Sequence, residues 1–142
     1  PAGTCGGRVM TGHFRHLMIY VADIGRSKAF YDKVLGHLKY SLVHGSDTYA
    51  MWAPEGGGCA FAISQGPLDK RSQTHDRGAP GWHHLAFNAD SREIIDRLHA
   101  DVLVPQAASI LDAPTECPEY SETYYACYFE DPDGLKLEVA TS

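Results

Sequence analysis

HLMIYVADIGRSKAFYDKVLG (residues 16–36) is the stretch that decides the fold, because its opening recurs as HLAFNAD at residues 84–90. In the first six positions, the side chains fall on two alternating faces in the manner of a strand. Asp23 then suits the N-cap of a helix in which apolar residues recur at helical spacing, and Gly36 suits the position just after that helix. The stretch therefore predicts a strand followed by an amphipathic helix.

The residues that follow each copy predict the rest of a repeated module. After the first helix, three short strands are expected, and the sequence PEGGG supplies the last turn. In the second copy, Asp90 is expected to open a helix with Glu93 in a capping box, and DPDG to turn the final hairpin. The expected strands lie at residues 38–44, 48–53 and 59–64 in the first copy and at 82–89, 103–110, 123–130 and 135–141 in the second, with a loop at 111–123.

This pattern predicts an α+β fold made of two βαβββ modules. A chain of 142 residues suits a single domain with its own core. Module one is expected at about residues 13–64 and module two at about 82–142, with a polar linker at about 65–81 that is rich in glycine and proline. Residues 1–12 show no periodicity and are expected to be a disordered lead or residues added for expression.

The composition predicts a cytoplasmic protein that binds neither membranes nor nucleic acid. Hydrophobic residues make up 44% of the chain, yet no apolar run approaches the roughly 18 residues of a membrane span. A net charge of -6 disfavours contact with phosphate backbones. No C-x-x-C pair is present, which disfavours a thiolate zinc site and suits free thiols in a reducing compartment. The four cysteines are Cys5, Cys59, Cys117 and Cys127.

Superposing the two copies predicts a set of equivalent positions. When His16 is laid on His84, the strand GCAFAIS falls on GLKLEVA, and Ala62 becomes the equivalent of Glu138. Two imidazoles and one carboxylate can bind one face of a divalent metal and leave positions open for water or substrate. His16, His84 and Glu138 are therefore candidate metal ligands, and the fourth position is vacant.

The position of Glu138 within its strand supports this interpretation. Leu137 and Val139 must face the core, so the side chains of Glu138 and Lys136 point to the opposite face. Inside a curved sheet, a carboxylate is costly unless it is paired or bound to a metal.

These residues resemble those of the vicinal oxygen chelate superfamily, also called the glyoxalase, bleomycin-resistance and extradiol-dioxygenase superfamily. The resemblance covers about residues 14–141 and rests on HLMIYVADIGRSKAFYDKVLG, WHHLAFNADS and YYACYFEDPDGLKLEVAT. It implies a cupped mixed sheet with helices on its outer face, built around a divalent metal such as Fe²⁺, Mn²⁺, Zn²⁺ or Ni²⁺. It also implies a homodimer, with modules that pair within or between chains.

The resemblance also assigns roles to individual residues. The family's second-module ligand lies three residues before a phenylalanine, which selects His84 rather than His83. His83 is then expected to face away, unless a bulge turns it towards the site. His16 matches the first-module ligand and Glu138 matches the last. Tyr128 stands ten residues before Glu138, as does a catalytic tyrosine of the extradiol dioxygenases.

Departures from the family patterns favour some activities over others. Glyoxalases and related epimerases usually carry a fourth ligand where this chain has Ala62. Fosfomycin-resistance thiol transferases share the ligand set, but their phosphonate-binding arginine lies beyond Glu138 and has no counterpart in this sequence. Bleomycin-binding proteins keep the fold without the metal.

The sequence thus leads to a metal-dependent enzyme hypothesis that favours chemistry of the extradiol-dioxygenase type. The substrate is expected to be a small oxygenated molecule that chelates the metal, with Tyr128 as the catalytic candidate and Lys136 as a possible substrate contact. A lyase, an isomerase, a thiol transferase and a drug- or metabolite-binding protein remain the alternatives. Turnover of bound ligand would separate an enzyme from a binding protein.

Overall fold

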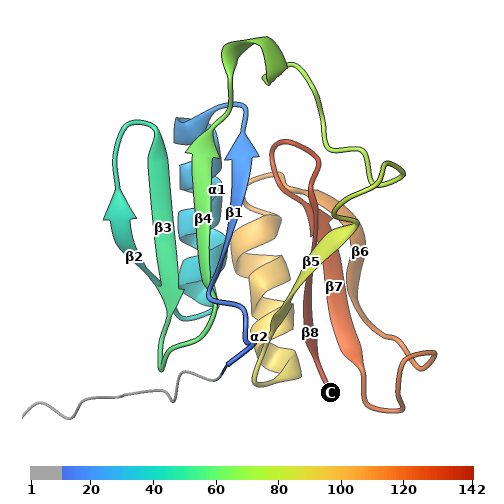
Figure 1. Cartoon of the computed structure of the whole chain (residues 1–142). Coiled ribbons are helices and arrows are strands. Elements are labelled where there is room, and N and C mark those ends of the chain that lie inside the picture. Colours follow the sequence, from blue (N-terminus) through green and yellow to red (C-terminus); the bar gives the residue numbers. More distant parts are fainter. Residues whose placement is uncertain (1–10) are drawn as a thin grey trace, which may run out of the picture. The chain divides into compact units, whose positions relative to one another are not determined.

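The computed structural model describes residues 11–142, and Figure 1 shows how their helices and strands are arranged. These residues fall into two compact units, one ending at Arg71 and the other beginning at Ser72. Each unit is described by itself below. The predicted lead at residues 1–12 lies mainly outside the described residues, as does Cys5. No helix in residues 11–142 combines the length and the apolar character that a membrane crossing needs.

Unit 1 contains the first βαβββ module. Its sheet has the strand order β1-β4-β3-β2, in which β1 and β4 run parallel and the other pairs run antiparallel. Helix α1 contacts β2, β3 and β4 and covers one face of this sheet (Figure 1). The elements are β1 (His16–Val21), α1 (Ile24–His37), β2 (Tyr40–Gly45), β3 (Tyr49–Pro54), β4 (Ala60–Gln65) and the short 3-10 helix η1 (Leu68–Lys70).

Unit 2 repeats this plan. Its strand order is β5-β8-β7-β6, and β5 and β8 form the parallel pair. Helix α2 contacts β7 and β8. The elements are β5 (His84–Asn88), α2 (Arg92–Arg97), the π-helical segment η2 (Leu98–Leu103), β6 (Ser109–Glu116), β7 (Tyr125–Glu130) and β8 (Lys136–Thr141). The α+β fold of two βαβββ modules with mixed sheets is therefore confirmed.

Strand register confirms the equivalence of the two copies. In unit 1, His16 pairs with Ala60, and Ala62 lies two residues further along β4. In unit 2, His84 pairs with Lys136, and Glu138 lies two residues further along β8. Ala62 and Glu138 therefore occupy the same place in their modules.

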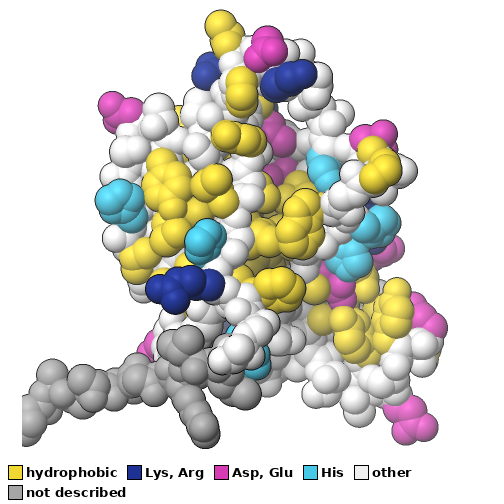
Figure 2. All heavy atoms as spheres, viewed as in Figure 1, with side chains coloured by type: hydrophobic (Ala, Val, Ile, Leu, Met, Phe, Trp, Pro, Cys, Tyr) yellow, Lys and Arg dark blue, Asp and Glu magenta, His cyan; other side chains and the backbone are white. Residues whose placement is uncertain are grey.

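Each sheet has one apolar face under its helix. In unit 1, Tyr31 of α1 packs on Trp52 and Phe61, with ring centroids 6.2 Å and 4.8 Å away. In unit 2, the core side chains Leu137 and Val139 are fully buried and alternate with Lys136 and Glu138 on the other face. Figure 2 shows hydrophobic side chains gathered over the strands of unit 1 on the face away from α1. Met18 and Tyr20 of β1 are among the exposed hydrophobic residues of this unit.

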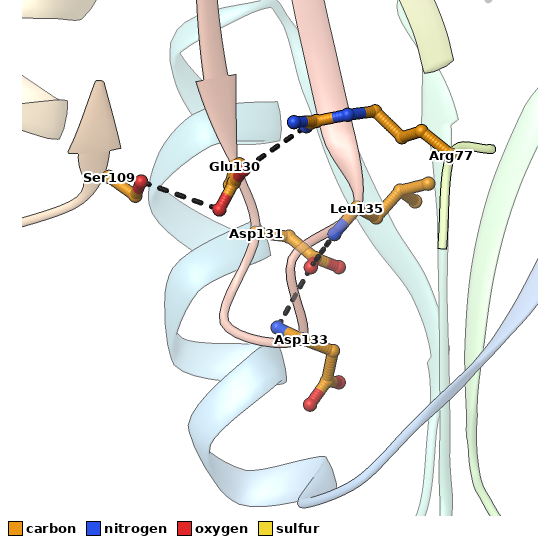
Figure 3. Close-up of polar contacts among 6 residues, drawn as sticks. All are labelled: Arg77, Ser109, Glu130, Asp131, Asp133 and Leu135. Atoms are coloured by element: carbon orange, nitrogen blue, oxygen red, sulfur yellow. Dashed lines mark hydrogen bonds and ion pairs between the residues drawn. The ribbon is translucent and has the colours of Figure 1, made fainter. Parts of the chain in front are cut away.

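The hairpin turn of unit 2 is built around one aspartate. Asp131 is 5% exposed, and its Oδ1 accepts the backbone N–H groups of Asp133 and Leu135, each at 2.9 Å (Figure 3). Gly134 adopts φ +82°, which a residue with a side chain rarely adopts. The DPDG turn predicted from the sequence is confirmed, and it fixes where β8 begins.

The helix boundaries differ from the sequence expectations in small ways. Helix α1 continues through Gly36, and the left-handed residue after it is Lys39, with φ +63°. Helix α2 is capped by Ser91 rather than Asp90, because the extended Ser91 backbone lets its hydroxyl accept the N–H of Ile94 at 3.4 Å.

One strand was predicted in the wrong place. The expected strand at 103–110 and loop at 111–123 are replaced by β6 at Ser109–Glu116, because η2 extends the helical segment to Leu103. Pro114 obscured β6 in the sequence, but β6 lies at the edge of its sheet, where proline is tolerated. Its ladder to β7 is also irregular on both sides of Asp112, which removes the clean alternation of a regular strand.

We expect Gln65→Met to destabilise unit 1. The Gln65 amide donates to the carbonyls of Ala22 (2.6 Å) and Val21 (3.3 Å), and its Oε1 accepts from the N–H of Ile24 (3.0 Å). The variant loses three hydrogen bonds that join the end of β4 to the end of β1 and the start of α1, so the free energy of unfolding should fall by about 1–3 kcal/mol in urea titrations. Gln73→Met on the exposed linker is the matched control, and an equal midpoint for both variants would contradict this role.

Candidate functional site

A cavity of about 510 Å³ lies in unit 2, on the face of the sheet opposite the core under α2. Two of its sides differ in charge. One side is formed by the start of β5 and the start of β8, with His83 just before β5, His84 as its first residue and Lys136 as the first residue of β8. The acidic residues come from β6 and the loop after it. Asp112, Glu116 and Glu119 are those acidic residues.

Glu138 lines this cavity and is only 4% exposed. Its neighbours in the sheet are mostly apolar, since Tyr128, Ala126 and Ala140 form a buried cluster with Cys117. A carboxylate in such surroundings needs donors to offset the loss of water.

Three side chains supply contacts to the Glu138 carboxylate. Tyr124 Oη donates to Oε1 at 2.6 Å, and Tyr128 Oη donates to the same oxygen at 3.1 Å. His84 Nε2 lies 3.1 Å from the other oxygen, Oε2. The two phenols therefore hold one carboxylate oxygen, and the imidazole faces the other.

Glu138 in turn keeps both phenols protonated. The hydrogen bond to Glu138, followed by desolvation and the negative charge of Glu138, raises the pKa of Tyr124 to about 12. Burial, and then the charge of Glu138, raises the pKa of Tyr128 strongly. Both tyrosines are therefore hydrogen-bond donors at neutral pH, and neither is available as a phenolate base.

The two adjacent histidines do not face opposite sides, although strand alternation predicts that they would; the structure instead agrees with the alternative in which an irregular backbone turns His83 towards the site. His83 and His84 both line the cavity, and their Nδ1 atoms are 2.7 Å apart. Strand alternation does not apply, because β5 begins at His84 and His83 belongs to the irregular segment before it. Desolvation and then the nearby charges of His84 and Lys136 lower the pKa of His83. A neutral His83 can therefore either donate or accept the hydrogen bond between the two Nδ1 atoms.

The donor set of His84 and Glu138 fits a divalent metal. Two ligand atoms bound at about 2.1 Å and at right angles lie about 3 Å apart, close to the observed His84–Glu138 separation of 3.1 Å. Imidazole nitrogen and carboxylate oxygen suit iron, manganese, zinc and nickel. These two residues are the ones that could hold the ion in unit 2.

The third predicted ligand, His16, lies in unit 1, where it is exposed at the start of β1 and pairs with Ala60. Within either unit, no three His, Cys, Asp or Glu side chains among residues 11–142 come close enough to hold an ion. The convergence of His16 with His84 and Glu138 therefore stays a prediction.

Tyr124 is the site residue that the sequence reasoning missed. Strand alternation could have found it, because Tyr124, Ala126 and Tyr128 share one side of the chain that faces Glu138. Tyr128 was singled out by its spacing to Glu138, and the structure brings the two together. Its catalytic role stays a prediction.

Comparison with known proteins agrees with this fold. The chain is 24% identical over 124 residues to the uncharacterized protein YqjT of Bacillus subtilis (strain 168), which covers 87% of this chain and 94% of that protein. A candidate glyoxalase from Bacillus halodurans superposes with a TM-score of 0.78 and 28% identity, covering 93% of this chain and 97% of that one. A glyoxalase/bleomycin resistance protein from Albidiferax ferrireducens T118 superposes with a TM-score of 0.72 and 27% identity. This match covers 89% of this chain and 97% of that one.

A family model extends the match along almost the whole described chain. The model of the Glyoxalase/Bleomycin resistance protein/Dioxygenase superfamily matches residues 13–139, which include both modules and all the site residues above. The chain therefore belongs to the glyoxalase, bleomycin-resistance and dioxygenase superfamily.

Proposed function

We propose that this protein is a divalent-metal-dependent enzyme that acts on a small oxygenated substrate. The observation that carries the proposal is the pair formed by His84 and Glu138, 3.1 Å apart and part of a 510 Å³ cavity. Family membership adds support, and the repeat equivalence of His16 and His84 supplies a third candidate ligand. In this proposal the protein is a cytoplasmic homodimer whose partner is a small molecule.

A divalent metal bound here would act as a Lewis acid on substrate oxygens. The residues of the chain would prepare the site for it. Tyr124 and Tyr128 occupy Oε1 of Glu138, so Oε2 is the oxygen left to bind an ion. A carboxylate held by two fixed donors loses little rotational freedom on binding, which favours affinity.

His83 would set the proton position on His84. With Nε2 of His84 facing Glu138, its proton lies on Nε2 and its Nδ1 accepts from His83. For Nε2 to be available as a metal ligand, the proton of His84 would have to lie on Nδ1, which would then donate to His83 Nδ1. The 2.7 Å contact serves both arrangements, because a neutral imidazole can donate or accept at Nδ1.

Within the superfamily, we favour chemistry of the extradiol-dioxygenase type. Tyr128 supports it, because its hydroxyl lies in the cavity beside the Glu138 ligand. The alanine at position 62 disfavours a glyoxalase reaction that needs a fourth ligand. A binding protein for a drug or metabolite is the alternative, and conversion of bound ligand separates the two. Metal analysis of protein purified without added metal, with anaerobic and aerobic spectra, is the direct test of the metal.

We expect His84→Ala and His83→Ala to affect the metal differently. His84→Ala removes a ligand and should leave less than about a tenth of the wild-type metal, because affinity falls steeply when one ligand is lost. His83→Ala should keep the metal stoichiometry but weaken affinity about tenfold, as expected when an outer hydrogen-bond partner is lost. Elemental analysis and competition with a chelator measure both. If only His83→Ala loses the metal, the assignment of the ligand is wrong.

We expect Tyr124→Phe to weaken metal binding about tenfold without removing it. The variant deletes the 2.6 Å donor to Oε1, so Tyr128 is the remaining donor to that oxygen and the carboxylate is less firmly oriented. Tyr120→Phe is the matched control, since Tyr120 packs on the ring of Tyr124 at 5.2 Å but gives no hydrogen bond to Glu138. Equal affinities for both variants would show that Tyr124 does not position the carboxylate.

We expect Ala62→Glu to raise metal affinity about tenfold or more, because it adds a carboxylate at the position equivalent to Glu138. Ala62 is fully buried, so an unpaired carboxylate there should also lower the thermal midpoint of the metal-free protein. Added metal should restore that midpoint. Weaker or unchanged metal binding would show that the equivalence of Ala62 and Glu138 does not extend to the site.

A further inference from the structure

The ammonium group of Lys136 holds an unusual position in the cavity of unit 2. Lys136 is the first residue of β8 and pairs with His84 across the parallel ladder. Its Nζ lies 4.6 Å from the ring centroid of Tyr128, so the ring face holds the side chain over the cavity. Within residues 72–142, this ammonium forms no ion pair with a carboxylate.

The absence of an ion pair has a structural cause. Glu130 is directly opposite Lys136 in the β7–β8 ladder, which makes it the carboxylate best placed to neutralise the lysine. Its Oε1 instead accepts from Arg77 at 3.1 Å, and its Oε2 accepts from Ser109 at 3.4 Å (Figure 3). Arg77 belongs to the segment before β5, which is tied to unit 2 where His75 N–H donates to the Asp133 carbonyl at 3.1 Å.

Four carboxylates line the cavity. Glu138 is held by Tyr124, Tyr128 and His84. The other three, Asp112, Glu116 and Glu119, come from β6 and the loop after it. Asp112 belongs to β6, and the strand order puts β7, with Tyr128, between β6 and β8. Glu116 pairs with Arg92 at 2.7 Å. The ammonium of Lys136 therefore lies at the start of β8, on the β5 side of the cavity and separated by β7 from the acidic residues of β6.

We propose that Lys136 binds an anionic group of the substrate, so that the ligand class is a small organic acid rather than a neutral diol. The anionic group, a carboxylate or a phosphonate, would lie beside the oxygen that chelates the metal at His84 and Glu138. This inference rests on the proposed function, because the chelating oxygen needs the metal. A lysine suits the role, because it is a compact point charge with three donors and its partner here is an aromatic face rather than an acid.

The test uses oxalate as the probe, because oxalate is a dianion that chelates through adjacent oxygens. Wild-type protein is loaded with Mn²⁺, and oxalate affinity is measured by calorimetry. Lys136→Gln should bind oxalate about tenfold more weakly, whereas its Mn²⁺ affinity should change less than about twofold, since the lost charge faces the ligand. Lys136→Arg should recover most of the loss. Lys33→Gln on the exposed face of α1 removes the same charge elsewhere and should bind oxalate like the wild type.

Arg77 provides a second test of the same proposal. Arg77→Gln should release Glu130, which can then pair with Lys136 across the ladder and weaken oxalate binding about threefold to tenfold. The double variant Arg77→Gln, Glu130→Gln removes the competing carboxylate and should restore the affinity. A purely structural role of Arg77 would not be restored by the second change.

The outcomes separate this inference from the proposed function. If the wild type binds Mn²⁺ and oxalate but Lys136→Gln binds oxalate equally well, the anion role of Lys136 is overturned and the metal site stands. If the wild type binds no Mn²⁺, the metal proposal fails. The anion role of Lys136 is then tested by backbone NMR shifts at residues 84 and 136 on addition of oxalate to metal-free protein. Shifts that vanish in Lys136→Gln support the anion site, and no shifts in the wild type refute it.

Discussion

The buried carboxylate of Glu138 is the constraint on which the cavity of unit 2 depends. It lies in a cluster of alanine, cysteine and tyrosine side chains, where an unpaired charge would be costly. Two phenols satisfy one oxygen and an imidazole faces the other. These contacts join the start of β5, the residue before β7, the middle of β7 and the middle of β8. The same groups that stabilise the carboxylate therefore also give the cavity its shape.

The second organising feature is the parallel pair at one edge of each sheet. A βαβββ module returns its last strand beside its first, so the start of β5 lies next to the start of β8, as β1 lies next to β4. The two modules then diverge in chemistry at one register position, where β4 carries Ala62 and β8 carries Glu138. In unit 1 the corresponding region has small and apolar side chains, including the exposed Met18 and Tyr20. The polar donors that surround Glu138 are thus a property of the second module.

Charge segregation follows from the segment that leads into β5. Arg77 lies in a stretch that the sequence presents as a polar linker, yet it bonds to Glu130 at the end of β7. Because Glu130 bonds to Arg77 and Ser109, it forms no ion pair with Lys136, which lies opposite it in the ladder and lines the cavity. Linker residues therefore affect the electrostatics of a site to which they contribute no ligand atom.

Local patterns in the sequence determined the repeat, helix α1, the hairpin around DPDG, and the common face of Lys136 and Glu138. Alternation along a strand depends on neighbouring residues alone, so it can be counted along the chain. Only the tertiary structure decided the position of β6, the turn of His83 towards His84, the donor role of Tyr124 and the Arg77–Glu130 pair. These depend on an edge strand with an irregular ladder and on side chains that meet across strands or from a segment without periodicity. For such contacts, sequence spacing has no fixed relation to distance, because the folded chain alone brings the groups together.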